Sequence, residues 1–161
     1  AFTYPLMKRY TYWPQLFLGI TFNYGLILGW TAINNQINIV PIVFYLGAIF
    51  WTLGYDTIYG FQDIKDDEII GLKSTSIKFK KTPFKFLYMA YSIFFLSLII
   101  VGYLIKFNNF YYLMLILIFL KLFFVQLKKL NIKNTKNCLQ TFKSNNYLGF
   151  LVFVSLIVGK L

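Results

Sequence analysis

The stretch FKFLYMAYSIFFLSLIIVGYLI, residues 84–105, decides the fold class of this chain. Its single charge, Lys85, lies at the edge of an otherwise uncharged run. A helix needs about 20 residues to cross a hydrocarbon core of about 30 Å. The stretch therefore predicts a transmembrane helix.

Four more apolar segments flank this one on both sides: Trp13–Thr31, Ile39–Tyr55, Phe110–Leu127 and Tyr147–Leu161. Lipid offers no hydrogen bonds to the backbone, and the alternation typical of barrel strands is absent, so each segment should be a helix. The chain is 58% hydrophobic and 13% charged, whereas soluble domains average about 45–50% and about 25%. We predict an all-α, multi-span transmembrane bundle that forms one domain over residues 1–161.

The basic residues are distributed unevenly between the two ends of the predicted spans. Most of them lie before the first span, between the second and third, or between the fourth and fifth: Lys8, Arg9, Lys65, Lys73, Lys78, Lys80, Lys81, Lys85, Lys128, Lys129, Lys133, Lys136 and Lys143. The opposite end has Lys106 and Lys160. The positive-inside rule then places the loop 56–83 in the cytoplasm or its organellar equivalent. Lys121, inside a span, is interpreted as snorkelling toward that side rather than as functional.

The net charge of +11 does not indicate a nucleic-acid partner, because the lysines form short clusters between apolar runs and make no continuous basic face. The chain has no His and a single Cys, Cys138. This composition argues against a disulfide framework and against a zinc or haem site built from this chain alone.

All acidic residues fall within positions 56–68, at the end of the second span: Asp56, Asp63, Asp66, Asp67 and Glu68. If a helix continues through Tyr55–Asp67, the side chains of Asp56, Tyr59, Asp63 and Asp67 share one face, at about 100° per residue. Clustered carboxylates without His or Cys favour Mg²⁺, which binds through one or two carboxylates and substrate phosphates. We therefore predict a magnesium site with a phosphorylated ligand, the alternative being a merely solvated loop.

Basic and hydroxyl groups accompany these carboxylates. Lys73 and Ser74 follow Asp67 closely and suit the remaining oxygens of a diphosphate. Lys8 and Arg9 lie on the same membrane side, and an Arg side chain suits a planar carboxylate. Ordinary positive-inside anchoring is an equal interpretation of Lys8 and Arg9.

Several motifs resemble the UbiA superfamily of intramembrane aromatic prenyltransferases, most of all its 4-hydroxybenzoate branch. Residues 55–67, YDTIYGFQDIKDD, look like its second Asp-rich motif, and residues 70–75, IGLKST, like the segment that follows. Residues 4–11, YPLMKRYT, with Pro14 and Gln15, are similar to the loop between its fourth and fifth helices. The stretch from Cys138 to Gly149 resembles the entry to its last helix.

This resemblance implies a nine-helix bundle of which the chain supplies the last five spans. The first Asp-rich motif of the family has no counterpart in this sequence. We therefore expect a fragment or the product of a split gene, with a separately encoded N-terminal half as one partner and little activity for the isolated chain.

The resemblance also implies a reaction: transfer of a polyprenyl group from a polyprenyl diphosphate to the ring carbon ortho to the hydroxyl of 4-hydroxybenzoate, in ubiquinone biosynthesis. Asp63 and Asp67 would bind Mg²⁺, supported by Asp56 and Tyr59. The substrates would contact a second set of residues, namely Tyr4, Lys8, Arg9, Lys73 and Ser74, with Arg9 on the carboxylate of the acceptor. The expected location is a bacterial inner membrane, or alternatively the mitochondrial inner membrane.

Two alternatives stay open. Within the family, the acceptor could be homogentisate, dihydroxynaphthoate or haem. Outside it, the carboxylates could serve a non-catalytic cation-binding or transport bundle, although transporters place such groups near the midplane.

The charge asymmetry generates a topology prediction. A cysteine introduced at Asn35 should be modified by a membrane-impermeant reagent from outside intact cells, whereas cysteines at Lys78 and Lys133 should not, because they face the cytoplasm. Labelling at position 78 would overturn the helix count.

Overall fold

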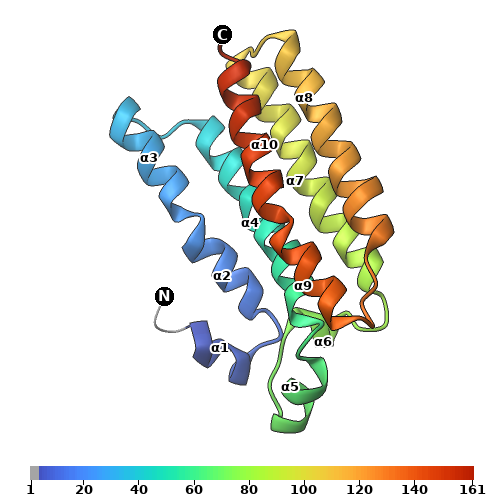
Figure 1. The fold of residues 1–161 in the computed structure, drawn as a ribbon. Coiled ribbons are helices and arrows are strands. Elements are labelled where there is room, and N and C mark those ends of the chain that lie inside the picture. Colours follow the sequence, from blue (N-terminus) through green and yellow to red (C-terminus); the bar gives the residue numbers. More distant parts are fainter. Residues whose placement is uncertain (1–3) are drawn as a thin grey trace.

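The computed structural model describes residues 4–161, with side chains from Leu6 onward, and the secondary structure of this part is entirely helical (Figure 1). The elements in chain order are α1 (Tyr4–Tyr10), α2 (Pro14–Phe22), α3 (Tyr24–Asn34), α4 (Ile39–Gly60), α5 (Ile64–Ile70), α6 (Thr75–Lys78), α7 (Pro83–Ile105), α8 (Asn109–Phe119), the π-helix η1 (Leu120–Leu127), α9 (Thr135–Lys143) and α10 (Asn145–Val158). The all-α prediction is confirmed.

Five helical stretches of the described part are long and apolar enough to cross a membrane, as predicted: Pro14–Asn34, Ile39–Gly60, Pro83–Ile105, Asn109–Leu127 and Thr135–Val158. The chain is thus an integral membrane protein. The predicted start of the last span, Tyr147, is wrong, because α9 and α10 together begin at Thr135. The amphipathic α9 buries Cys138 and keeps Lys136 exposed. Because one of its faces is polar, α9 contains no continuous apolar run and was not recognised as part of a span.

Helices α4 and α7 form the centre of the bundle, and their contact face is the main hydrophobic core. Leu53 on α4 and Leu87, Tyr91 and Phe94 on α7 are almost completely buried. Gly54 lets the two helices approach, because a Cβ atom there would lie 2.6 Å from Cε1 of Tyr91. Small residues at such crossings allow close packing where lipid provides no hydrophobic drive.

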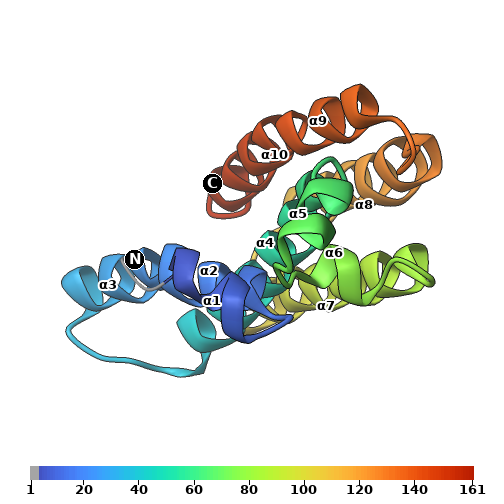
Figure 2. The same cartoon turned by 90° about the horizontal axis from the view of Figure 1, so that it is seen from below.

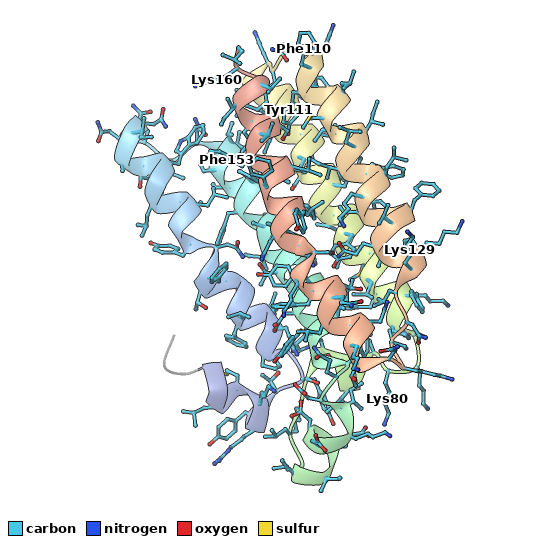
Figure 3. All side chains as sticks on the ribbon, viewed as in Figure 1. Lys80, Phe110, Tyr111, Lys129, Phe153 and Lys160 are labelled. Carbon is cyan, nitrogen blue, oxygen red and sulfur yellow. The ribbon has the colours of Figure 1, made fainter. Side chains whose placement is uncertain are left out.

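The short elements α1, α5 and α6 gather at one end of the bundle, together with the start of α9 (Figures 1 and 2). Lys80 lies at this end, whereas Lys160 and Phe110 lie at the opposite end (Figure 3). The acidic segment 56–68 therefore reaches the end of the bundle at which the short elements collect.

The close α4–α7 contact predicts that Gly54→Ala lowers the free energy of unfolding by about 1–3 kcal/mol, because the added methyl must displace the Tyr91 ring. Denaturation of the purified protein in detergent, followed by circular dichroism, measures this. Gly25→Ala is the matched control, since no atom lies within 4 Å of a Cβ at that position. Equal stability of the two variants would contradict the packing argument.

Candidate functional site

The helix that carries the acidic residues is interrupted in the middle of the cluster. α4 ends at Gly60 and α5 starts at Ile64, so the predicted continuous helix through Tyr55–Asp67 is wrong. In the break, the backbone N–H of Gln62 donates to the carbonyl of Tyr59 at 3.1 Å, and the backbone N–H of Asp63 donates to the carbonyl of Gly60 at 3.3 Å. Each bond spans three residues. This tighter turn redirects the chain and buries the Phe61 side chain.

The break divides the four predicted site residues into two pairs. Asp56 and Tyr59 lie on α4 before it, where Asp56 is half-buried and the Tyr59 ring packs 4.9 Å from that of Phe142. Asp63 is the N-cap of α5 and Asp67 lies in its first turn, and the Asp67 amide donates to the Asp63 carbonyl at 2.8 Å. The two residues are therefore separated by one turn at the start of α5. A shared role for their carboxylates stays a prediction.

The two carboxylates of α5 differ clearly from the other acidic residues around them. Asp67 is only 7% exposed, and Asp63, at the start of α5, makes no capping bond with its side chain. Asp66 and Glu68 are exposed, and Glu68 forms an ion pair with Lys80. Asp66 and Glu68 therefore lie at the surface of the helix end.

Lys8 forms an ion pair with one of these carboxylates, and Lys73, from a distant part of the sequence, is bonded to Lys8 through the backbone. Lys8 Nζ lies 3.4 Å from Asp67 Oδ2, which links α1 to α5. The Lys73 amide donates to the Lys8 carbonyl at 2.7 Å, and Lys73 Nζ donates to the Tyr10 carbonyl at 3.4 Å. One predicted cation, Lys8, is thus paired with one predicted carboxylate, and the backbone of a second, Lys73, is held next to it.

A buried polar network, which the sequence analysis missed, holds the segment after Lys73 against α4. The side-chain carbonyl of Gln15 accepts from the Thr75 amide at 3.0 Å, and the hydroxyls of Thr75 and Thr57 lie 2.6 Å apart. The Ser76 hydroxyl donates to the Thr57 carbonyl at 2.9 Å. The run of small hydroxyl residues 74–76 was the available signal, because such side chains can satisfy backbone groups inside a bundle.

The remaining predicted substrate ligands have different surroundings. Ser74 is 1% exposed, and its hydroxyl accepts from the Ile77 amide at 3.2 Å as the N-cap of α6. Arg9 is exposed on the last turn of α1. The Tyr4 side chain lies outside the described residues. The substrate-binding roles of all three stay predictions.

A cavity of about 480 Å³ lies farther along α4 from the acidic end. It is lined by aromatic and amide side chains from α2, α4, α9 and α10 and from the α2–α3 junction: Phe22, Asn23, Trp51, Thr52, Tyr55, Phe142, Asn145, Asn146 and Gly149. The rings of Tyr55 and Tyr59 both pack on Phe142, at 5.7 and 4.9 Å. These rings form a continuous aromatic wall from the acidic end of α4 to the cavity.

The residues at the acidic end fit Mg²⁺ only with help from a ligand. Among the described residues, no group of three or more His, Cys, Asp and Glu side chains could hold a metal ion. The Asp63 and Asp67 carboxylates are hard oxygen donors, and Mg²⁺ commonly uses one or two of these together with phosphate oxygens and waters. The donor set therefore suits Mg²⁺ with a diphosphate and does not suit a dedicated protein cage.

Comparison with known proteins identifies similar chains. The model of the UbiA prenyltransferase family matches residues 1–157. The chain is 42% identical over 161 residues to the 4-hydroxybenzoate polyprenyltransferase, mitochondrial, of Bos taurus, covering 99% of this chain and 43% of the relative. It is 38% identical to a 4-hydroxybenzoate octaprenyltransferase of Francisella tularensis subsp. novicida, covering 98% and 55%. The chain thus spans about half the length of these relatives. No solved structure matches it.

The buried network predicts that Gln15→Leu frees the segment 73–79, because the Thr75 amide is left without its acceptor, at a cost of about 1–3 kcal/mol. Hydrogen exchange measured by mass spectrometry should speed up in that segment. Gln62→Leu is the control, since the side-chain amide of Gln62 makes only an exposed hydrogen bond, to the Tyr59 carbonyl. Unchanged exchange in Gln15→Leu would refute the anchoring role.

Proposed function

Because the chain belongs to the UbiA prenyltransferase family, we propose that it forms the diphosphate-binding part of a 4-hydroxybenzoate polyprenyltransferase. The reaction transfers a polyprenyl group from a polyprenyl diphosphate to the ring carbon ortho to the acceptor's hydroxyl and releases diphosphate. The observation that carries this proposal is the Lys8–Asp67 ion pair at one end of a transmembrane bundle, with the backbone of Lys73 bonded to that of Lys8. The names of the relatives support 4-hydroxybenzoate as the acceptor over homogentisate, dihydroxynaphthoate or haem.

The proposed partner is a segment that carries the other Asp-rich motif of the family. The chain spans about half the length of its curated relatives, so the activity of the whole protein is part of this proposal. The N-terminal part would contribute the carboxylates and spans that complete the bundle.

The diphosphate of the donor binds at the acidic end. Asp63 and Asp67 would hold Mg²⁺, with Asp56 and Tyr59 in support, and the bound ion would supply charge stabilisation for the leaving diphosphate. Lys8 contacts Asp67, so its ammonium would lie near a phosphate that a metal ion on that carboxylate would bind. Lys73 is bonded to Lys8 through the backbone, and its ammonium, which donates to the Tyr10 carbonyl, would supply a second positive charge to the diphosphate.

The transfer follows from bond breaking at the allylic carbon. The allylic C–O bond breaks and its electron pair leaves with the diphosphate, whose charge Lys8 and Lys73 neutralise. The ring carbon next to the phenol attacks the allylic carbon and then loses its proton, which restores the aromatic ring. The surrounding helices exclude water that would hydrolyse the allylic cation.

The proposed location is a bacterial inner membrane with the active-site loops in the cytoplasm, or alternatively the mitochondrial inner membrane, where the name of the bovine relative places that protein. A transport function is disfavoured because the carboxylates lie at one end of the bundle and not at its midplane. The membrane lipids are the other expected contact of the exposed apolar faces.

The first functional prediction separates two neighbouring acidic residues. Asp67→Asn should lower prenyl transfer by orders of magnitude, because it removes a buried carboxylate of the proposed metal pair, and Asp63→Asn should do the same. Glu68→Gln is the matched control, since Glu68 is exposed and pairs with Lys80. Transfer of a radiolabelled prenyl group by the reconstituted full-length enzyme, with membrane insertion checked for each variant, measures the effect. Equal losses at positions 67 and 68 would contradict the assignment.

The second prediction assigns Arg9 to the carboxylate of the acceptor. Arg9→Ala should raise the KM for 4-hydroxybenzoate at least about tenfold, because loss of a charge-assisted pair in a poorly hydrated site costs about 2–5 kcal/mol. The KM for the prenyl diphosphate should change little, and Arg9→Lys should restore only part of the loss. Lys65→Ala controls for removal of an exposed charge on the same side. A selective rise in the diphosphate KM would move Arg9 into the diphosphate site.

A further inference from the structure

The wall of the cavity away from the acidic end is held by a buried hydrogen-bond network within the membrane-spanning region. Gln126, near the end of η1, is 3% exposed. Its amide nitrogen donates to the Tyr91 hydroxyl on α7 at 2.9 Å and to Oδ1 of Asn145 on α10 at 3.3 Å. The side chain of Gln126 thus joins three spans at one point.

Asn145 is fully engaged by this arrangement. Its Oδ1 atom also accepts from the indole Nε1 of Trp51 at 3.1 Å. Its amide nitrogen donates to the carbonyls of Thr141 and Phe142, each at 3.1 Å. Any rotation of the Asn145 side chain would leave buried polar groups without partners, which is costly away from water. Asn145 therefore fixes the position of the indole.

The π-helix explains why Gln126 reaches this point. A π-helix closes its turns from residue i to i+5, so it is wider than an α-helix, and such turns occur often at functional sites. Within η1, Leu122, Gln126 and Leu127 are all buried. The wider turn lets neighbouring positions 126 and 127 both face the core.

Trp51 is held on its other sides by aromatic rings. Its ring stacks on Phe94 with a centroid distance of 5.2 Å and an interplanar angle of 10°, and it meets Tyr55 edge-on at 5.7 Å. Trp51 and Asn145 both line the cavity. The cavity therefore has one rigid indole wall, whose orientation is set by groups outside the cavity, Gln126 and Phe94.

The position of Trp51 along α4 indicates which part of a substrate it would meet. At 1.5 Å per residue, Trp51 lies about 12 Å along the helix from Tyr59, on the side away from the Asp63–Asp67 pair. A donor whose diphosphate binds at that pair would bring its reactive carbon near the acidic end and its apolar chain past Tyr59 and Tyr55 toward Trp51. The rigid indole faces the chain and not the reacting atoms.

We infer that Trp51 determines how the enzyme discriminates donors by chain length, and that Gln126 is a positioning residue that holds Trp51 through Asn145. This inference rests on the proposed function. A chain long enough to reach the indole is bound partly by it. A donor too short to reach the indole is bound without it.

The test compares donors of different length in membranes that contain the protein. Trp51→Leu and Gln126→Met should each raise the KM for geranylgeranyl diphosphate about tenfold, equivalent to about 1.4 kcal/mol, and leave the KM and kcat for dimethylallyl diphosphate unchanged. Gln62→Met is the matched control outside the network and should alter neither donor. Equal losses for both donors would show a merely structural role and overturn the inference, as would no change for either.

A binding measurement separates this inference from the proposed function. In a Trp13→Phe, Trp30→Phe background, reconstituted with an N-terminal part in which every Trp is replaced by Phe, the fluorescence comes from Trp51 alone. A hydrolysis-resistant geranylgeranyl diphosphate analogue should shift this emission, and the dimethylallyl analogue should not, although both should bind in a competition assay. Binding of both analogues without a shift overturns the role of Trp51 and leaves the proposed function standing. Binding of neither analogue contradicts the proposed function and this inference with it.

Discussion

Lipid cannot hydrogen-bond a peptide group, and this constraint governs each place where the helices of this chain are interrupted. At the α2–α3 junction, the Asn23 amide donates to the carbonyls of Gly19 and Ala48 and to the Thr52 hydroxyl. At the start of α6, Gln15 accepts the Thr75 amide. The first interruption is satisfied by its own Asn23 side chain and the second by Gln15 of α2. The first borders the cavity, and the second borders the Lys8–Lys73 contact. Irregular backbone at these two places needs hydrogen bonds that lipid cannot give, so it occurs where other protein groups supply them, next to the candidate site.

The break at Phe61–Asp63 separates an aromatic region of the chain from a charged one. Before it, Trp51 and Tyr55 form an aromatic wall suited to an apolar chain. After it, Asp63, Asp67 and the two lysines form a strongly charged group at the end of the bundle. A substrate with an ionic head and an apolar tail matches this order. Burying carboxylates at the level of Trp51 would cost far more, since charges within a span are expensive.

Span number and the gathering of charge at one end could be predicted because both depend on run length and composition, which residues 84–105 display without tertiary information. The break after Gly60 could not be predicted, since the spacing of Asp56, Tyr59, Asp63 and Asp67 is helical and nothing in that spacing indicates the turn that buries Phe61. The start of the last span was hidden by the polar face of α9. The role of Gln126 was equally invisible, because a π-turn has no sequence signature. The carboxylate pair on α5 was predicted because it requires only one helical turn.

The link between Trp51 and Asn145 has a consequence for how the protein is made. The two residues are 94 positions apart, and the Lys8–Asp67 pair spans 59. Contacts between residues so far apart in sequence form late in folding, because a long loop must close first at a cost in entropy. In addition, a chain synthesised from its N-terminus inserts its last helix last. The cavity wall therefore exists only after α10 has entered the bilayer. Until then the indole N–H of Trp51 lacks the Asn145 oxygen that it donates to, so the cavity is complete only at the end of synthesis.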